Sequence, residues 1–115
     1  MKINERQFGL AVRTITNDTH KKIMFMLYKD NTLTYNGIRD NLKIERNRNE
    51  SGKFAYYMRV LKDRKIIKKD GRYYFLTRFG LQITKLVYDL QQVCMEYDLS
   101  DCDADGKIMV IVKRK

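Results

Sequence analysis

The stretch Ser51–Ile67, SGKFAYYMRVLKDRKII, alternates apolar and cationic side chains with few neutral polar residues between them. Its apolar residues recur every three or four positions, which predicts one buried face of a helix over 51–63. That face comprises Phe54, Tyr57, Met58 and Leu61. The opposite face, at 100° per residue, comprises Gly52, Ala55, Tyr56 and Arg59, with Lys53 less well placed. We expect a helix that is anchored on one side and exposes cations on the other.

The residues on either side of this helix predict its boundaries. The polar segment 43–50, KIERNRNE, is typical of a loop, and Ser51 is the expected N-cap. After the helix, Ile66 and Ile67 open a strand, and residues 73–76 return as a second strand. Asp70-Gly71 between them is a dipeptide favoured in two-residue type I′ turns, so we expect a β-hairpin.

Three further helices are expected before Ser51. Phe8, Ala11, Val12 and Ile15 have helical spacing over 4–14, although a shorter strand with alternating Phe8, Leu10 and Val12 remains an alternative. Asn17 or Asp18 caps a second helix, which Asn31 ends. Its predicted apolar face comprises Ile23, Met24, Leu27 and Tyr28. Thr34 caps a third, short helix that buries Ile38 and Leu42.

A long final helix is expected after Thr77, its N-cap. Apolar residues recur along it at alternating intervals of three and four, the pattern of a helix that packs against a partner helix. We expect them to form a dimer interface: Ile83, Leu86, Val87, Leu90, Val93, Cys94 and Tyr97. The remaining residues, 98–115, are expected to form an acidic loop and a short apolar strand that ends in three cations.

Helices followed by a β-hairpin predict a mainly α fold with a small β component, α+β in class, of the winged helix-turn-helix type. The 115 residues suit a single domain, 1–115, with its core over 17–79 and a dimerisation helix over 80–97. Neither a proline nor a Gly/Ser-rich linker marks an internal boundary.

The positive charge is concentrated in one part of the sequence. The chain carries a net charge of +10, and residues 43–78 hold 12 Lys and Arg against four Asp and Glu. That segment alone therefore contributes +8, which leaves +2 for all the other residues. A basic block of this kind indicates a polyanionic partner such as nucleic acid.

Composition also bears on the compartment. No run of apolar residues is long enough to cross a membrane, and the charged start, MKINERQFGL, is unlike a signal peptide. Cys94 and Cys102 are too few for a disulfide scaffold and lack CxxC spacing. We expect a cytoplasmic, nucleoid-associated protein with reduced thiols.

The helix over 51–63 and the hairpin provide the candidate DNA contacts. A recognition helix places its first residues at base edges in the major groove, and a basic hairpin reaches phosphates or the minor groove. The expected DNA-binding residues are Ser51, Lys53, Ala55, Tyr56, Arg59, Lys68, Lys69, Arg72, Arg46 and Arg48. The alternatives are an ordinary solvated helix face and an edge strand kept soluble by its lysines.

Much of this segment resembles a known family. The match runs through THKKIMFMLYKDNTLTYNGIRDNL and SGKFAYYMRVLKDRKIIKKDGRYYFLTRFGLQI, and is similar to archaeal ArsR-like winged-helix transcriptional regulators. Tyr57 stands where the family commonly has histidine, and the loop before Ser51 is longer and more basic than usual. The resemblance implies a homodimer on double-stranded DNA, paired through terminal helices, with Lys53, Tyr56 and Arg59 on the recognition helix.

Three other motifs in the sequence lack residues that their binding sites require. Residues 101–106, DCDADG, begin like a calcium-binding EF-hand loop, but the position of the bidentate glutamate is Val112. NESGK lacks the first glycine of a phosphate-binding loop, and Phe54 replaces its Ser/Thr. His20, Cys94 and Cys102 are too far apart for a metal-sensing cluster, and Cys94 is expected to pack as a small hydrophobic residue. No set of residues suggests catalysis, a metal or a cofactor, so we expect no enzyme.

The sequence therefore predicts a double-stranded DNA-binding transcriptional regulator whose partners are DNA and a second copy of the chain. Two alternatives remain: a winged helix that binds proteins of the transcription or replication machinery, and a non-specific architectural protein of the chromosome. The operator and any small-molecule effector are not specified by these patterns.

Overall fold

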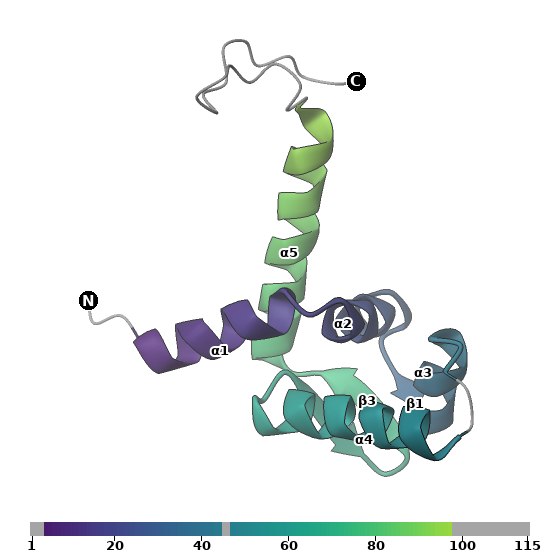
Figure 1. Ribbon diagram of the computed structural model, residues 1–115. Coiled ribbons are helices and arrows are strands. Elements are labelled where there is room, and N and C mark those ends of the chain that lie inside the picture. Colours follow the sequence, from purple (N-terminus) through teal and green to yellow (C-terminus); the bar gives the residue numbers. More distant parts are fainter. Residues whose placement is uncertain (1–3, 45–46, 98–115) are drawn as a thin grey trace. The chain divides into compact units, whose positions relative to one another are not determined.

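Eight elements follow one another in the computed structural model, which describes residues 4–44 and 47–97 (Figure 1). In chain order they are α1 (Glu5–Ile15), α2 (Asp18–Asp30), β1 (Leu33–Thr34), α3 (Tyr35–Asn41), α4 (Arg48–Asp63), β2 (Ile67–Asp70), β3 (Tyr73–Leu76) and α5 (Arg78–Glu96). Helices dominate, and the three short strands form one antiparallel sheet. The fold is therefore α+β and mainly helical.

Helices α2 and α3 begin where their capping residues predict. The side chain of Asn17 accepts a hydrogen bond from the His20 N–H at 2.9 Å, and Thr34 accepts one from the Gly37 N–H at 3.0 Å. Asn31 ends α2 with a positive φ of 68°, which asparagine adopts more often than most residues other than glycine. These boundaries of α2 and α3 confirm the prediction from the sequence.

Helix α1 confirms the helical interpretation of its segment, and the alternative strand is wrong. The side chain of Asn4 caps it by accepting a hydrogen bond from the Gln7 N–H at 3.1 Å. Its predicted apolar face is only partly covered in the described chain, since Phe8 is 67% exposed. Thr14 is instead the buried residue of α1, and its hydroxyl accepts a hydrogen bond from Arg64.

Helix α4 begins three residues earlier than predicted. Ser51 is not its N-cap: the Asn47 side chain accepts a hydrogen bond from the Glu50 N–H at 2.8 Å, and Ser51 lies in the second turn. Asn47 and Glu50 have the spacing of a capping box, which is the signal that marks this start. Arg48 is consequently helical rather than part of a loop, and Lys53 lies beyond the free N–H groups of the first turn.

The sheet has one strand more than the predicted hairpin. The strand order is β1-β3-β2, with Leu33 opposite Tyr74 and Ile67 opposite Leu76. The two turn residues are Gly71 and Arg72, because Asp70 still pairs with Tyr73. A type I′ turn needs a positive φ at both central residues, but of these two only Gly71 has one, 62°. The predicted type I′ turn over Asp70-Gly71 is therefore wrong.

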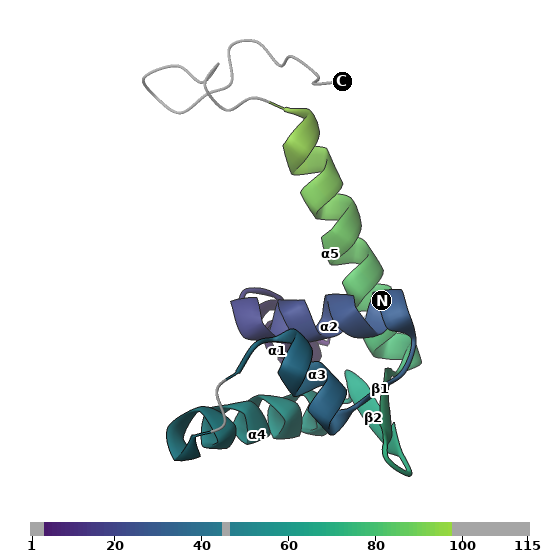
Figure 2. The ribbon, with the colours of Figure 1, turned by 90° about the vertical axis from the view of Figure 1, so that its right-hand side faces the viewer.

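The core lies where α2, α3 and α4 meet β2 and β3, and Figure 2 shows α3 between α2 and α4. Its fully covered side chains include Phe54, Met58 and Leu61 of α4, which confirms the predicted buried face, and Tyr57 packs at its margin. The other members are Ile23, Met24, Leu27, Ile38, Ile66, Ile67 and Tyr74. Because α4 is anchored on this side, its other side chains are held outward.

The turn that follows α4 has a defined hydrogen-bonding pattern. The Ile66 N–H donates to the Leu61 carbonyl and the Lys65 N–H to the Lys62 carbonyl, each at 3.0 Å, which is a Schellman motif. Lys65 has a φ of 60° in this motif, at the position where glycine is usual. The Thr77 hydroxyl accepts from the Gly80 N–H and donates to the Lys65 carbonyl, and the Thr77 N–H donates to the Ile66 carbonyl at 3.0 Å. These bonds fix the predicted start of α5 against this turn.

The contacts within the chain divide it into two units, Met1–Thr84 and Lys85–Lys115, with the boundary inside α5. The elements of the candidate site all belong to the first unit. The predicted acidic loop and strand over 98–115 lie outside the described residues, as do Arg46 and Cys102.

Candidate nucleic-acid interface

The outward face of α4 carries most of the residues that the sequence singled out. Ala55, Tyr56 and Arg59 are exposed, Tyr56 by 53%. The guanidinium of Arg59 lies over the Tyr56 ring, 5.5 Å from its centroid, and forms no ion pair with the described carboxylates. Such cation–π contact orients an arginine and leaves its N–H donors available for another group.

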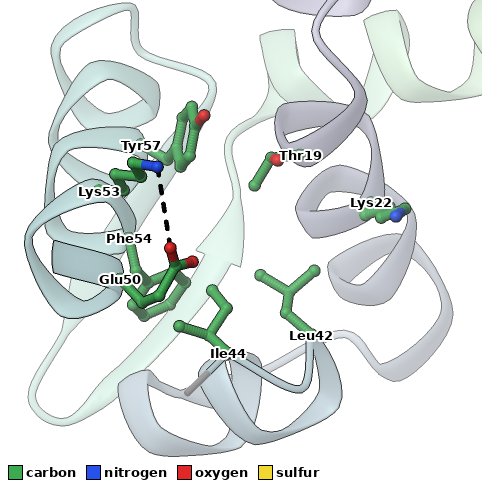
Figure 3. A pocket seen from close by; sticks show the side chains of 8 residues that line it. All are labelled: Thr19, Lys22, Leu42, Ile44, Glu50, Lys53, Phe54 and Tyr57. Atoms are coloured by element: carbon green, nitrogen blue, oxygen red, sulfur yellow. Dashed lines mark ion pairs between the residues drawn. The ribbon is translucent and has the colours of Figure 1, made fainter. Parts of the chain in front are cut away.

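Lys53 lies on a different side of α4. Its ammonium pairs with Glu50 at 3.7 Å, at the mouth of a hollow of about 260 Å³ between α4, α2 and the end of α3 (Figure 3). Leu42, Ile44 and Phe54 form the apolar part of its lining, and Lys22 extends away from the other labelled side chains. At 100° per residue, Lys53 is about 60° around the helix from Tyr56 and about 120° from Arg59.

The hairpin presents the cations that were expected there. Lys68, Lys69 and Arg72 are all exposed. Lys69 lies over the ring of Tyr74, 5.7 Å from its centroid, and Arg72 lies over that of Tyr73 at 6.0 Å. Tyr74 is a core residue, so the base of the hairpin is anchored while its charged ends remain accessible.

A hollow of about 210 Å³ separates the hairpin from the start of α3. It is lined by Thr34, Tyr35, Asn36, Lys69, Arg72 and Tyr74. Burial raises the pKa of Tyr35, and Tyr74 raises it further while Arg39 acts in the opposite direction. The Tyr35 hydroxyl therefore remains protonated at neutral pH and can donate a hydrogen bond to an anion beside the two cations.

A second basic concavity contains residues that the sequence interpretation missed. It encloses about 590 Å³ and is lined by Lys62, Lys65, Ile67, Lys68, Lys69 and Thr77. Lys62 belongs to the last turn of α4 and Lys65 to the turn after it. Helical periodicity alone does not predict that these two side chains face the hairpin. Their signal in the sequence is the run of lysines on both sides of Ile66-Ile67.

The remaining predicted DNA contacts are less central. Arg48 is exposed in the first turn of α4, and Ser51 is half-buried within the helix. Arg46 lies outside the described residues. The structure thus brings Ala55, Tyr56 and Arg59 together on one face of α4, and Lys68, Lys69 and Arg72 together on the hairpin.

The predicted dimer residues divide into two groups. Leu86, Leu90, Val93 and Tyr97 are exposed, by 68%, 58%, 50% and 38%, and Cys94 is exposed as well rather than packed. Ile83 is half-buried against the core of the first unit, and Val87 is buried. The seam of α5 is therefore largely apolar surface in the described single chain.

Within residues 4–44 and 47–97, no group of three or more His, Cys, Asp or Glu side chains is placed to hold a metal ion. None of the helices in this part of the chain is both long and apolar enough to span a bilayer.

Comparison with known proteins gives no further assignment: no family model, no curated protein and no solved structure matches this chain.

Proposed function

We propose that this protein is a winged helix-turn-helix regulator of transcription that binds double-stranded DNA as a homodimer. In this proposal α3 and α4 are the helix pair, α4 enters the major groove, and the hairpin of β2 and β3 is the wing. The observation that carries the proposal is that α4 buries Phe54, Met58 and Leu61 while exposing Ala55, Tyr56 and Arg59 beside a hairpin rich in cations.

The two parts of the surface have different roles. Arg59 suits guanine, since a guanidinium can donate two hydrogen bonds to its O6 and N7 atoms, and Ala55 suits a thymine methyl group. Lys68, Lys69 and Arg72 on the hairpin suit phosphates, whose contacts provide affinity and fix the register without reading sequence. Tyr56 supports Arg59 through the contact between their side chains.

Dimerisation would place two such surfaces on one DNA site. The exposed apolar residues of α5, Leu86, Leu90 and Val93, supply a surface whose burial by a second copy is favourable. A two-fold dimer requires half-sites separated by about one turn of DNA or a multiple of it. The resemblance to dimeric winged-helix regulators is consistent with this arrangement.

A binding titration tests the proposal. We expect Arg59→Ala to weaken binding to a preferred duplex by roughly 5- to 100-fold, because one bidentate base contact is lost. Lys69→Ala should weaken binding to all duplexes and make the salt dependence shallower by about 0.9 per protomer. Fluorescence anisotropy with labelled duplexes at several salt concentrations measures both; unchanged curves for both variants would contradict DNA binding by this face.

Selection of bound fragments from random DNA separates the proposed regulator from the two alternatives. A regulator enriches a defined site, and Arg59→Ala relaxes the preference at one position. A chromosome-architectural protein binds tightly without enriching a site, whereas a protein-interaction module binds DNA weakly and indifferently.

A further inference from the structure

Four lysines surround the concavity between the end of α4 and the edge of the sheet. Lys62 comes from the last turn of α4, Lys65 from the turn after it, and Lys68 and Lys69 from β2. No acidic residue lines this concavity, and none of the four ammonium groups forms an ion pair with a carboxylate of residues 4–44 and 47–97. Four neighbouring cations without counter-charges repel one another, and an anion among them removes that repulsion.

Lys65 supplies its charge from an unusual backbone conformation. Its φ of 60° lies in the left-handed region, which is unfavourable for a residue with a Cβ and in which glycine is usual at this position of a Schellman motif. A lysine kept in such a position is a candidate functional residue. Lys43 shares this backbone without lining the concavity, so the charge cluster carries the inference and the strain provides its test.

The concavity also continues the proposed DNA-binding surface. Lys62 follows Arg59 by three residues, so the two side chains lie on neighbouring strips of α4. Lys69 lines this concavity and also the smaller hollow between the hairpin and the start of α3. A polyanion on the outward face of α4 therefore meets Lys62 and Lys69 without leaving the surface.

We propose that this concavity, which adds Lys62 and Lys65 to Lys68 and Lys69 of the hairpin, is a second phosphate-binding site that holds the backbone of the bound DNA beyond the segment contacted by Arg59. The inference rests on the proposed function. Within it, the lysines supply non-specific affinity, and Lys65 is retained at a strained position because its charge contributes to that affinity.

The chain offers a matched control for Lys65. Lys43 ends α3 in the same motif: its N–H donates to the Asp40 carbonyl at 3.0 Å, the Ile44 N–H donates to the Arg39 carbonyl at 3.3 Å, and its φ is 57°. Lys43 is exposed, but it does not line the concavity. Replacing either lysine by glycine removes one charge and relieves the same backbone strain.

The experiment compares Lys65→Gly, Lys43→Gly and Lys62→Ala with the unaltered protein. We expect both glycine variants to melt at a temperature equal to that of the unaltered protein or a few degrees higher, roughly 2–6 °C. With labelled duplex DNA, Lys65→Gly and Lys62→Ala should each make the slope of log K against log salt shallower by about 0.9 per protomer, whereas Lys43→Gly should leave it unchanged.

Two results would overturn the inference. If the unaltered protein binds DNA but Lys65→Gly and Lys62→Ala keep its salt slope, the lysines serve only the helix end and the solubility of the edge strand. Equal losses in Lys65→Gly and Lys43→Gly would show a general effect of charge and no site. If the unaltered protein binds no duplex at all, the proposed function itself fails, and this outcome is distinct from the other two.

Discussion

At the scale of single residues, His20 occupies an unusual environment. It is 4% exposed, its ring meets that of Tyr57 edge to face at 5.1 Å between centroids, and neither ring nitrogen has a hydrogen-bond partner among the described residues. Burial, together with the smaller effect of the nearby positive charge of Arg64, lowers the pKa of His20 from 6.5 to about 4. The folded protein therefore holds this ring neutral.

This burial predicts a specific dependence of stability on pH. The unfolded chain binds a proton at His20 at higher pH than the folded chain, so the contribution of His20 is complete above about pH 6.5 and is lost as the pH falls toward 4. The full loss is on the order of 3 kcal/mol. Urea unfolding at a series of pH values measures it.

His20→Phe is the matched variant, because a phenyl ring keeps the edge contact with Tyr57 and has no nitrogen to leave unpaired. We expect this variant to be more stable than the unaltered protein near pH 6 and to lose the decline between pH 6.5 and 5, where few carboxylates titrate. Parallel stability curves for the two proteins would contradict this account of His20.

At the scale of elements, the start of α5 is fixed by a close approach to the turn after α4. A Cβ placed on Gly80 would lie 2.0 Å from the Ile66 carbonyl oxygen, which is backbone and already accepts hydrogen bonds from Thr77. The position therefore requires glycine for lack of space, even though it is helical. The same carbonyl joins the hairpin, the preceding turn and the cap of α5.

Gly80→Ala should consequently destabilise the fold by about 3 kcal/mol, since relief of the overlap requires α5 and the turn to separate. Gly9→Ala in α1 is its control: nothing lies within 4 Å of the added Cβ, so the better helix propensity of alanine should stabilise by about 0.5–1 kcal/mol. Urea midpoints of both variants test the pair; a Gly80→Ala protein as stable as the unaltered one would contradict the close approach.

The elements also show which boundaries can be predicted from the sequence. Asn17, Thr34 and Thr77 are local signals, because a side-chain oxygen caps an N–H only three residues away, and these helix starts were predicted correctly. For α4 the sequence predicts a start at Ser51, whereas the N-cap is Asn47. The polar residues around Asn47 have the composition of a loop, and this hides the capping pair that Asn47 forms with Glu50. Strand β1 has only two residues and pairs with β3, more than 35 positions further along, so no local periodicity announces it.

At the scale of the whole molecule, the proposed dimer has a quantitative consequence. If each protomer neutralises three to five phosphates, log K should fall with log salt with a slope of about −5 to −9 for the dimer. Leu90→Lys places a charge on the exposed seam of α5 and should yield monomers, for which the slope is about half as steep.

Sedimentation at micromolar concentration measures the oligomeric state in this test, and anisotropy titrations measure the slope. Lys85→Ala, an exposed change on α5 outside the seam, is the control that should leave the dimer intact. A monomer by sedimentation for the unaltered chain would contradict dimerisation without bearing on the DNA-binding face.

The candidate site was predicted only in part for a reason that also belongs to this scale. Periodicity separates the buried side of α4 from its exposed side, and this identified Tyr56 and Arg59. Periodicity does not say which exposed strip faces the hairpin. That depends on how β2 packs beside α4, which places Lys62 toward the hairpin, whereas Lys53 lines the hollow between α4 and α2. The concavity beyond α4 could therefore be found only from the three-dimensional arrangement.

The left-handed backbone at Lys65 has a consequence for laboratory evolution of this chain. A selection for heat resistance alone should replace Lys65 by glycine early, because a single substitution relieves the strain without altering the core. A selection that also demands retention on DNA should reject the same substitution and accept glycine at Lys43. Under the second selection, Lys65 would be kept and Lys43 replaced by glycine, although the two lysines have the same charge and the same backbone conformation.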